Sequence, residues 1–348
     1  MDTMTHEVGL VTVGIDTHRD VHVAAVLDAQ GRELGSASFP TTAAGHRALA
    51  RWAGEFGSID AIGIEGTGAW GAGIARDLTR RGYRIYEVDR PDRKTRRRHG
   101  KSDTIDAYAA ARAVQAGTAS GTPKTRDGNI ESIRALRVAR RSAVKARTQA
   151  IVQIRCLVST APDELRDTLR TLTATQLVIT TARYRPNPTT TPTHATKLAL
   201  RSIARRYQHL NDEIRELDIQ LDALVAQTAP GLLATHGVGT DVAGQLLVTT
   251  GDNPHRITSE AKFAHLCGTA PIPASSGRTD RHRLNRGGDR QANAALHRIA
   301  ITRLRSHEPT RAYMQRRTQQ GLTKREIIRC LKRYIAREIY NELTNPTT

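Results

Sequence analysis

The sequence predicts a mixed α/β region, then two long helices, then a mostly α C-terminal region. Short runs of β-branched and apolar residues fill positions 8–88, and such runs are typical of strands. Further along, leucine and isoleucine recur at spacings of three and four residues, which is the helical pattern. The last third again has helical periodicity around a segment rich in Gly, Pro and Ser. We therefore expect three regions, with bounds 1–120, 129–228 and 229–348.

The composition of the 348-residue chain favours a polyanionic partner. Lys and Arg number 53 against 34 Asp and Glu, a formal charge of +19, so nucleic acid is the leading candidate. Aromatic residues make up 4%, which favours recognition of the nucleic-acid backbone over base stacking. The three cysteines are widely separated, so we expect reduced thiols and neither disulfides nor zinc. With no signal peptide and no membrane-spanning apolar run, we expect a cytoplasmic protein without a membrane partner.

The N-terminal region begins with three predicted strands. Val8–Ile15 is apolar and β-branched and ends in Asp16, which indicates a buried strand that delivers a carboxylate at its end. Val21–Leu27 predicts a second strand, and the turn at Asp28–Gly31 leads to a third at Leu34–Phe39. These strands form an antiparallel meander.

Helices and strands alternate after the meander. The expected elements are a helix capped by Thr41 or Thr42, a strand at Ile59–Ile64, a helix at Gly71–Arg81 and a strand at Tyr83–Val88. With the Ala-rich helix that starts near Asp103, the order is βββαβαβα. A meander followed by crossover connections is typical of a ribonuclease-H-like layered α/β domain.

Four acidic residues converge in this arrangement. Asp16 and Glu65 end strands that we expect to be neighbours, while Asp103 and Asp106 share one face of the following helix. Four carboxylates at one sheet end suit Mg²⁺ (or Mn²⁺) and two-metal phosphodiester chemistry. Taken singly, each residue has a structural alternative: a turn for Asp16, a solvated strand end for Glu65, and capping for Asp103 and Asp106.

A basic segment precedes the helix that carries Asp103. Residues 89–101 include Arg96, Arg97, Arg98 and Lys101. Charge runs are usually solvated loops. Next to a metal nuclease site, however, these cations would hold a phosphate backbone.

Three motifs carry a family resemblance: Gly14–Asp20, Gly63–Gly68 and Lys101–Ala107. They resemble the acidic motifs of the DEDD transposases of bacterial insertion sequences (insertion-sequence family 110), the bridge-RNA-guided recombinases. All four acids match in kind and order, and Arg19 stands where that family often has lysine. The resemblance implies a RuvC-like domain in which Asp16, Glu65, Asp103 and Asp106 bind metal. It also implies DNA (element ends and target), a structured guide RNA and further protomers as partners.

Two long helices are predicted in the middle of the chain. In residues 130–158, cations such as Arg140 interrupt the apolar seam, which predicts a poor helix–helix contact. The same helix is predicted to carry a basic surface that binds nucleic acid, with Arg137, Arg141 and Lys145 among its residues. Leu200–Leu224 has an unbroken three-and-four spacing, which predicts a coiled coil. This helix would pack on the basic helix or on a second protomer, giving a dimer or tetramer.

The C-terminal region contains two candidate functional segments. Gly237-Val-Gly239 resembles the turn of a helix-hairpin-helix, which binds phosphate through backbone N–H groups, although it also suits a plain turn. Ser275-Ser276-Gly277 lies among Arg278, Arg283 and Arg286, and is most simply a flexible turn. The family resemblance implies that Ser276 is a nucleophile in a transposase domain, with Ser275 beside it. Helices are expected at Asn293–Arg305 and Thr323–Leu343.

The interpretation we favour is a transposase or recombinase that cuts and joins DNA with a DEDD metal site and a serine. A RuvC-type Holliday-junction resolvase would use the same acids without a serine step. A non-catalytic nucleic-acid scaffold would account for the charge and the helices, but not for four convergent acids.

Overall fold

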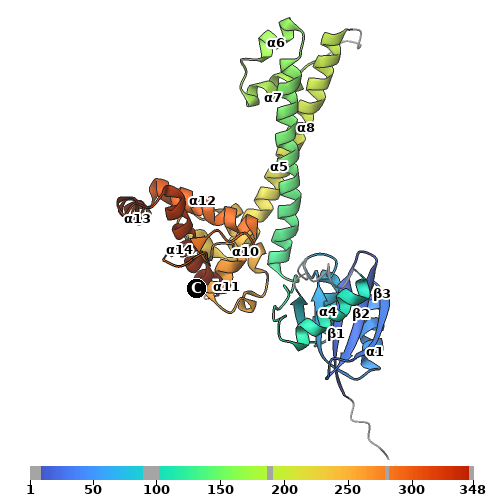
Figure 1. Ribbon diagram of the computed structural model, residues 1–348. Coiled ribbons are helices and arrows are strands. Elements are labelled where there is room, and N and C mark those ends of the chain that lie inside the picture. Colours follow the sequence, from blue (N-terminus) through green and yellow to red (C-terminus); the bar gives the residue numbers. More distant parts are fainter. Residues whose placement is uncertain (1–8, 89–101, 186–190, 279–281, 345–348) are drawn as a thin grey trace, which may run out of the picture. The chain divides into compact units, whose positions relative to one another are not determined.

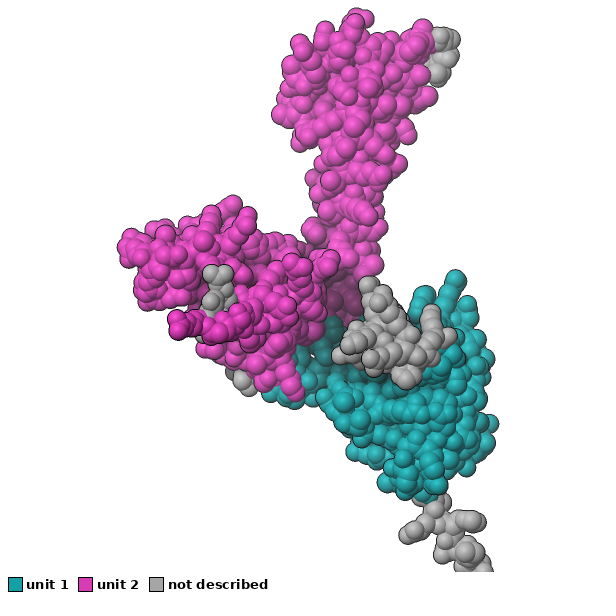
Figure 2. Space-filling model, in the orientation of Figure 1, with its two compact units in different colours: residues 1–128, 250–258 teal, residues 129–249, 259–348 magenta. Residues whose placement is uncertain are grey.

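The computed structural model describes residues 9–88, 102–185, 191–278 and 282–344 (Figure 1). Two compact units are distinguished in Figure 2. Unit 1 comprises Met1–Gly128 and Thr250–Thr258, and unit 2 comprises Asn129–Thr249 and Ser259–Thr348. The three regions expected above remain a prediction.

A five-stranded sheet forms the centre of unit 1. Its strands are β1 (Leu10–Thr17), β2 (Val21–Asp28), β3 (Glu33–Pro40), β4 (Ser58–Glu65) and β5 (Ile85–Val88), in the order β3-β2-β1-β4-β5. β1, β2 and β3 pair antiparallel, as the meander predicted, whereas β4 pairs parallel to both β1 and β5. The carboxyl ends of β1 and β4 therefore meet at one edge of the sheet.

Helices cover both faces of this sheet. α1 (Ala43–Gly54) and α2 (Ala72–Arg80) pack on one face through a core that includes Leu49, Ile74 and Leu78. α4 (Asp103–Gln115) covers the other face through Ala107, Tyr108 and Ala111 (Figure 1). The predicted order βββαβαβα is confirmed, and Thr42 is the N-cap of α1, since its hydroxyl accepts from the Gly45 N–H at 3.1 Å.

A short segment from much later in the chain completes unit 1. Residues 250–258 contain the turn η1 (Pro254–Arg256) and the buried Asn253. The amide of Asn253 donates to the Pro123 carbonyl at 2.9 Å and accepts from the Thr125 N–H at 3.3 Å. These bonds pair buried backbone groups of residues 123–125 across about 130 positions of sequence, a contact that no local pattern predicts.

Two antiparallel helices form the long arm of unit 2, α5 (Asn129–Ser159) and α8 (Pro192–Thr228), with α6 (Asp163–Leu169) and α7 (Ala174–Ala182) between them in sequence (Figure 1). The expectation of a poor seam on α5 was wrong. Small residues such as Ala143 and Ala150 are buried and allow close approach. The seam cations find partners on α8: Arg140 pairs with Asp218, and Arg147 Nη1 donates to Asn211 Oδ1 at 2.7 Å.

The rest of unit 2 is mostly helical, as predicted. Its helices are α9 (Pro230–Ala234), α10 (Thr240–Thr250), α11 (Glu260–Leu266), α12 (Arg290–Ser306), α13 (Glu308–Gln319) and α14 (Lys324–Thr344). A two-stranded ribbon, β6 (Ile272–Pro273) and β7 (His282–Arg283), stands beside them. Among the described residues, no helix is long and apolar enough to cross a membrane.

Candidate active site

Strand pairing places Asp16 and Glu65 at the same sheet edge. Ile15 is in register with Ile64, so the next residues of β1 and β4 lie side by side where both strands end. Both acidic residues are buried, with 7% exposure each. The Thr17 hydroxyl donates to the Glu65 backbone carbonyl at 2.8 Å, which ties the two strand ends together.

Two glycines bring α4 against these strands. Gly14 and Gly63 are register partners on β1 and β4. A Cβ atom at Gly14 would lie 1.9 Å from the Ala107 carbonyl oxygen, and one at Gly63 would lie 2.7 Å from that of Ala110. The backbone of α4 therefore rests directly on the sheet, a close approach that glycine alone permits. Because α4 begins at Asp103, its first turn faces the end of β1.

The imidazole of His18 joins Asp16 to Asp103. Its Nε2 atom lies 3.1 Å from Asp16 Oδ2 and 3.3 Å from Asp103 Oδ1. The ligand atoms of these three residues all lie within 4.8 Å of one another, which is close enough to surround one ion. Carboxylate oxygens are the ligands that Mg²⁺ prefers, so Asp16 and Asp103 could bind a hard cation while His18 lies beside them.

Burial and neighbouring charge both raise the pKa of the Asp16 carboxyl group. Burial is the larger cause, and the carboxylates of Asp106 and Asp103 add to it, while the contact with His18 opposes it. A cation bound there would offset the repulsion among these carboxylates. The donor set therefore fits a divalent metal.

Asp106 and Glu65 complete the predicted set of four acids. Asp106 is 6% exposed and close enough for its charge to act on Asp16. The three-residue group around His18 contains neither Asp106 nor Glu65. The capping interpretation of Asp103 does not hold, since Ser102 is the N-cap residue and Asp103 is the first residue of the helix.

His18 is a site residue that was not predicted. It follows Asp16 by two positions, and alternate residues of an extended chain point to the same side. That spacing could have identified it. The predicted phosphate-binding cations Arg96, Arg97, Arg98 and Lys101 lie outside the described residues.

The serine segment lies in unit 2 between β6 and β7. Ser275, Ser276, Gly277 and Arg278 are all exposed, and Gly277 has a φ of +55°. Arg283 and Arg286 are exposed as well. An exposed hydroxyl among cations is accessible to a polyanion. Gly237, with a φ of +82°, lies between α9 and α10, and the helix-hairpin-helix interpretation of this turn stays a prediction.

The predicted cations of α5 differ in their surroundings. Arg137 is 14% exposed at its side chain and donates to Asp241 Oδ1 at 2.8 Å and to Gln245 Oε1 at 3.2 Å. These bonds favour a structural role for Arg137 within unit 2. Arg141 and Lys145 are exposed and one helical turn apart, so they can contact a nucleic-acid backbone.

A layered α/β domain with acids gathered at the carboxyl ends of adjacent strands is typical of enzymes that act on nucleic-acid phosphodiester bonds. Residues 13–162 match the family model of the IS110-type DEDD transposases, described as "Transposase", and residues 230–315 match the model described as "Transposase IS116/IS110/IS902 family". The first match contains all four acids and the second contains Ser276.

Together the two matches cover more than half of the chain, which belongs to the IS110 family of DEDD transposases. It is a DNA transposase with a ribonuclease-H-like domain. No curated protein matches the chain significantly.

Proposed function

We propose that this transposase cuts and joins DNA with a RuvC-like metal site and a serine nucleophile, guided by a structured RNA in the bacterial cytoplasm. The observation that carries the proposal is the cluster of acidic residues where β1 ends and α4 begins. There, the carboxylates of Asp16 and Asp103 share the His18 imidazole, and the charge of Asp106 acts on Asp16.

In this proposal Asp16, Glu65, Asp103 and Asp106 hold Mg²⁺ or Mn²⁺. The metal supplies stabilisation of the negative charge that develops during phosphodiester exchange. The chain contributes a fixed set of oxygens: strand register positions Asp16 and Glu65, and the packing of α4 on Gly14 and Gly63 positions Asp103 and Asp106. His18 orients the carboxylates of Asp16 and Asp103 through its Nε2 atom.

The serine step exchanges one phosphodiester bond for another. The Ser276 oxygen attacks phosphorus, a Ser276–phosphate ester forms, and the bond from phosphorus to one sugar oxygen breaks. The serine loses its proton and the departing sugar oxygen gains one, so the free hydroxyl can later reverse the reaction on a new end. Arg278, Arg283 and Arg286 would stabilise the charge on the phosphate in the transition state.

Nucleic acid and further protomers are the proposed partners. Arg141 and Lys145 on α5, with the cations of residues 89–101, would follow the backbone of DNA or of the guide RNA. Apolar residues exposed on the long helices, such as Val138, Val152 and Ile219, support pairing of protomers through a coiled coil.

A denaturing gel tests the serine step. Wild-type, Ser276→Ala and Ser275→Ala proteins are incubated with Mg²⁺, labelled element-end DNA and the transcript that flanks the element. We expect a covalent protein–DNA band from the wild type and from Ser275→Ala, and none from Ser276→Ala. Equal cleavage by all three proteins without any covalent band would favour a resolvase-like nuclease and leave Ser276 as a turn residue.

A further inference from the structure

Unit 2 buries one lysine without an acidic partner. Lys332, on α14, is 7% exposed, and its Nζ atom donates to Asn293 Oδ1 at 2.8 Å. No carboxylate pairs with it among the residues that the structure describes. Burial and the nearby Arg329 both lower the pKa of Lys332. Lysine is rarely buried unless it is paired, so this position is unusual.

Another buried cation of unit 2 has the usual arrangement. Arg303, on α12, is also 7% exposed, but it donates to both carboxylate oxygens of Glu338 at 2.7 and 2.8 Å and to the His236 carbonyl at 2.8 Å. The fold can therefore supply a carboxylate where it buries a cation. At Lys332 it supplies an amide oxygen, which leaves most of the positive charge uncompensated.

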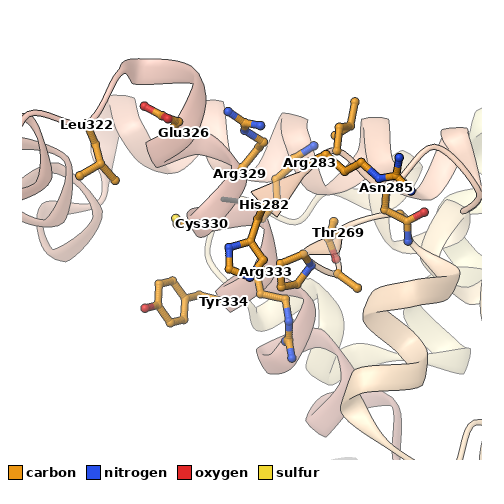
Figure 3. Close-up of a pocket in the computed structure, with 15 residues that line it drawn as sticks. Thr269, His282, Arg283, Asn285, Leu322, Glu326, Arg329, Cys330, Arg333 and Tyr334 are labelled. Carbon is orange, nitrogen blue, oxygen red and sulfur yellow. The ribbon is translucent and has the colours of Figure 1, made fainter. Parts of the chain in front are cut away.

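A cavity of about 670 Å³ lies between α14 and the ribbon β6–β7, and Lys332 is one of the residues that line it. Figure 3 shows this cavity. Arg329 and Arg333 come from α14, and His282 and Arg283 from the ribbon. Glu326 is the one acid among the described lining residues, and its carboxylate already accepts from the N–H and hydroxyl groups of Thr323 at 2.8 and 2.6 Å. Arg333 pairs with Glu260. The cavity is therefore cationic, with Lys332, Arg329 and Arg283 as its uncommitted charges.

An aromatic and an aliphatic side chain also border the cavity. Tyr334 is 53% exposed and Leu284 is 49% exposed. The ring of Tyr313 contacts Tyr334 edge-on, with centroids 5.7 Å apart, and holds it in place. Aromatic residues are scarce in this chain, so an exposed tyrosine that is held by a second ring and shares a cavity lining with cations is a specific feature. Bases of single-stranded nucleic acid stack on such rings while cations bind the backbone.

We propose that this cavity binds an unpaired, phosphate-bearing nucleotide of the nucleic-acid partner. Lys332, Arg329 and Arg283 take the phosphate, and Tyr334 and Leu284 take the base. The volume lies in the range of small-molecule sites, and it exceeds what a phosphate ion alone would need. The site goes beyond the proposed function, because it uses neither the four acids nor Ser276 and shares only Arg283 with the proposed serine site; the variants that test it therefore leave Arg283 in place.

Equilibrium binding of the full-length protein in EDTA tests this assignment. The probes are a fluorescein-labelled 12-nucleotide single strand and a 12-base-pair duplex, followed by fluorescence anisotropy. We expect Lys332→Met and Arg329→Gln to weaken single-strand binding about tenfold, and Tyr334→Ala about fivefold or more, with duplex binding changed less than twofold. Arg325→Gln, an exposed position on α14 that does not line the cavity, is the matched control and should change neither.

Three results would overturn the proposal. Wild-type single-strand affinity in Arg329→Gln and Lys332→Met would show that the cavity is not used. Equal losses in Arg325→Gln and Arg329→Gln would indicate a diffuse electrostatic effect. Displacement of the strand by 10 mM inorganic phosphate, with no effect of Tyr334→Ala, would reduce the cavity to a simple anion site. Because EDTA suppresses metal chemistry, failure here leaves the metal and serine proposals untouched.

Discussion

The two units contain charge imbalances of opposite sign. At the edge of the sheet in unit 1, Asp16 and Asp103 gather around His18, and the charge of Asp106 acts on Asp16. In unit 2, Lys332 is buried against an amide, beside Arg329 and Arg283. Without a bound ligand, each arrangement destabilises the protein, because like charges repel and a buried charge loses its hydration.

The difference between the two sites indicates which ligand each one binds. Clustered oxygens match a divalent cation, and clustered nitrogens match a phosphate. Two other buried or mostly buried cations among the described residues are paired with an acid within the fold, Arg303 with Glu338 and Arg137 with Asp241. The uncompensated charges of the two candidate sites thus lie where function can account for them, and functional sites are where local rules are expected to be broken.

The largest expected effect comes from the acidic site. Asp16→Asn should reduce DNA cleavage about a thousandfold, whereas Asp20→Asn, at an exposed position close by, should retain activity. Because the pKa of Asp16 is raised, its carboxylate costs stability at neutral pH. Asp16→Asn should therefore unfold at an equal or higher temperature in EDTA. An active Asp16→Asn protein would refute the metal-site proposal.

The glycine contact beneath α4 can be broken directly. Gly14→Ala would place a methyl group 1.9 Å from the Ala107 carbonyl, so we expect the free energy of unfolding to fall by about 3 kcal/mol or more. Gly54→Ala is the control, since a Cβ atom there has nothing within 4 Å. Urea denaturation measures both. Wild-type stability in Gly14→Ala would mean that α4 does not rest on β1 at this position.

Unit 1 buries the imidazole of His22 without pairing it with a carboxylate among the described residues. It is 1% exposed, its Nδ1 atom has no hydrogen-bond partner among the described residues, and its pKa is lowered to about 4 by burial and by His46 and His18. The unfolded state binds the proton near pH 6.5, so stability should fall as the pH drops from 6.5 to 4, by up to about 3 kcal/mol. Thermal unfolding of His22→Leu should have a flatter pH dependence over this range. An unchanged slope would exclude His22 as the cause.

The smallest effects should separate paired from unpaired cations in unit 2. Arg137→Met leaves Asp241 without one partner, so we expect a loss of about 1–2 kcal/mol. Lys332→Met removes a charge without a carboxylate and should leave the unfolding temperature unchanged or raised. Arg141→Gln should change stability by less than about 0.5 kcal/mol but weaken DNA binding. A marked loss of stability in Lys332→Met would assign that lysine a structural role.

Local patterns determined much of unit 1. Short runs of β-branched and apolar residues predicted β1 to β5, and Thr42, one of the two expected N-caps, caps α1 through its hydroxyl group. The spacing of Asp103 and Asp106 placed both on the first turn of one helix. These features depend on neighbours along the chain, so a single sequence carries them. Because the same motifs resemble those of a known family, they also predicted the activity of a transposase, and the family matches support this prediction.

Contacts between distant residues were decided only by the tertiary structure. The position of His18 between two carboxylates depends on how α4 meets β1. Arg140 interrupts a seam in the sequence, yet it reaches Asp218 on a helix 78 residues away. Asn253 joins unit 1 across about 130 residues. The burial of Lys332 beside a cavity likewise arises from packing, because periodicity assigns a residue to a helix face but does not specify which side chains will oppose it.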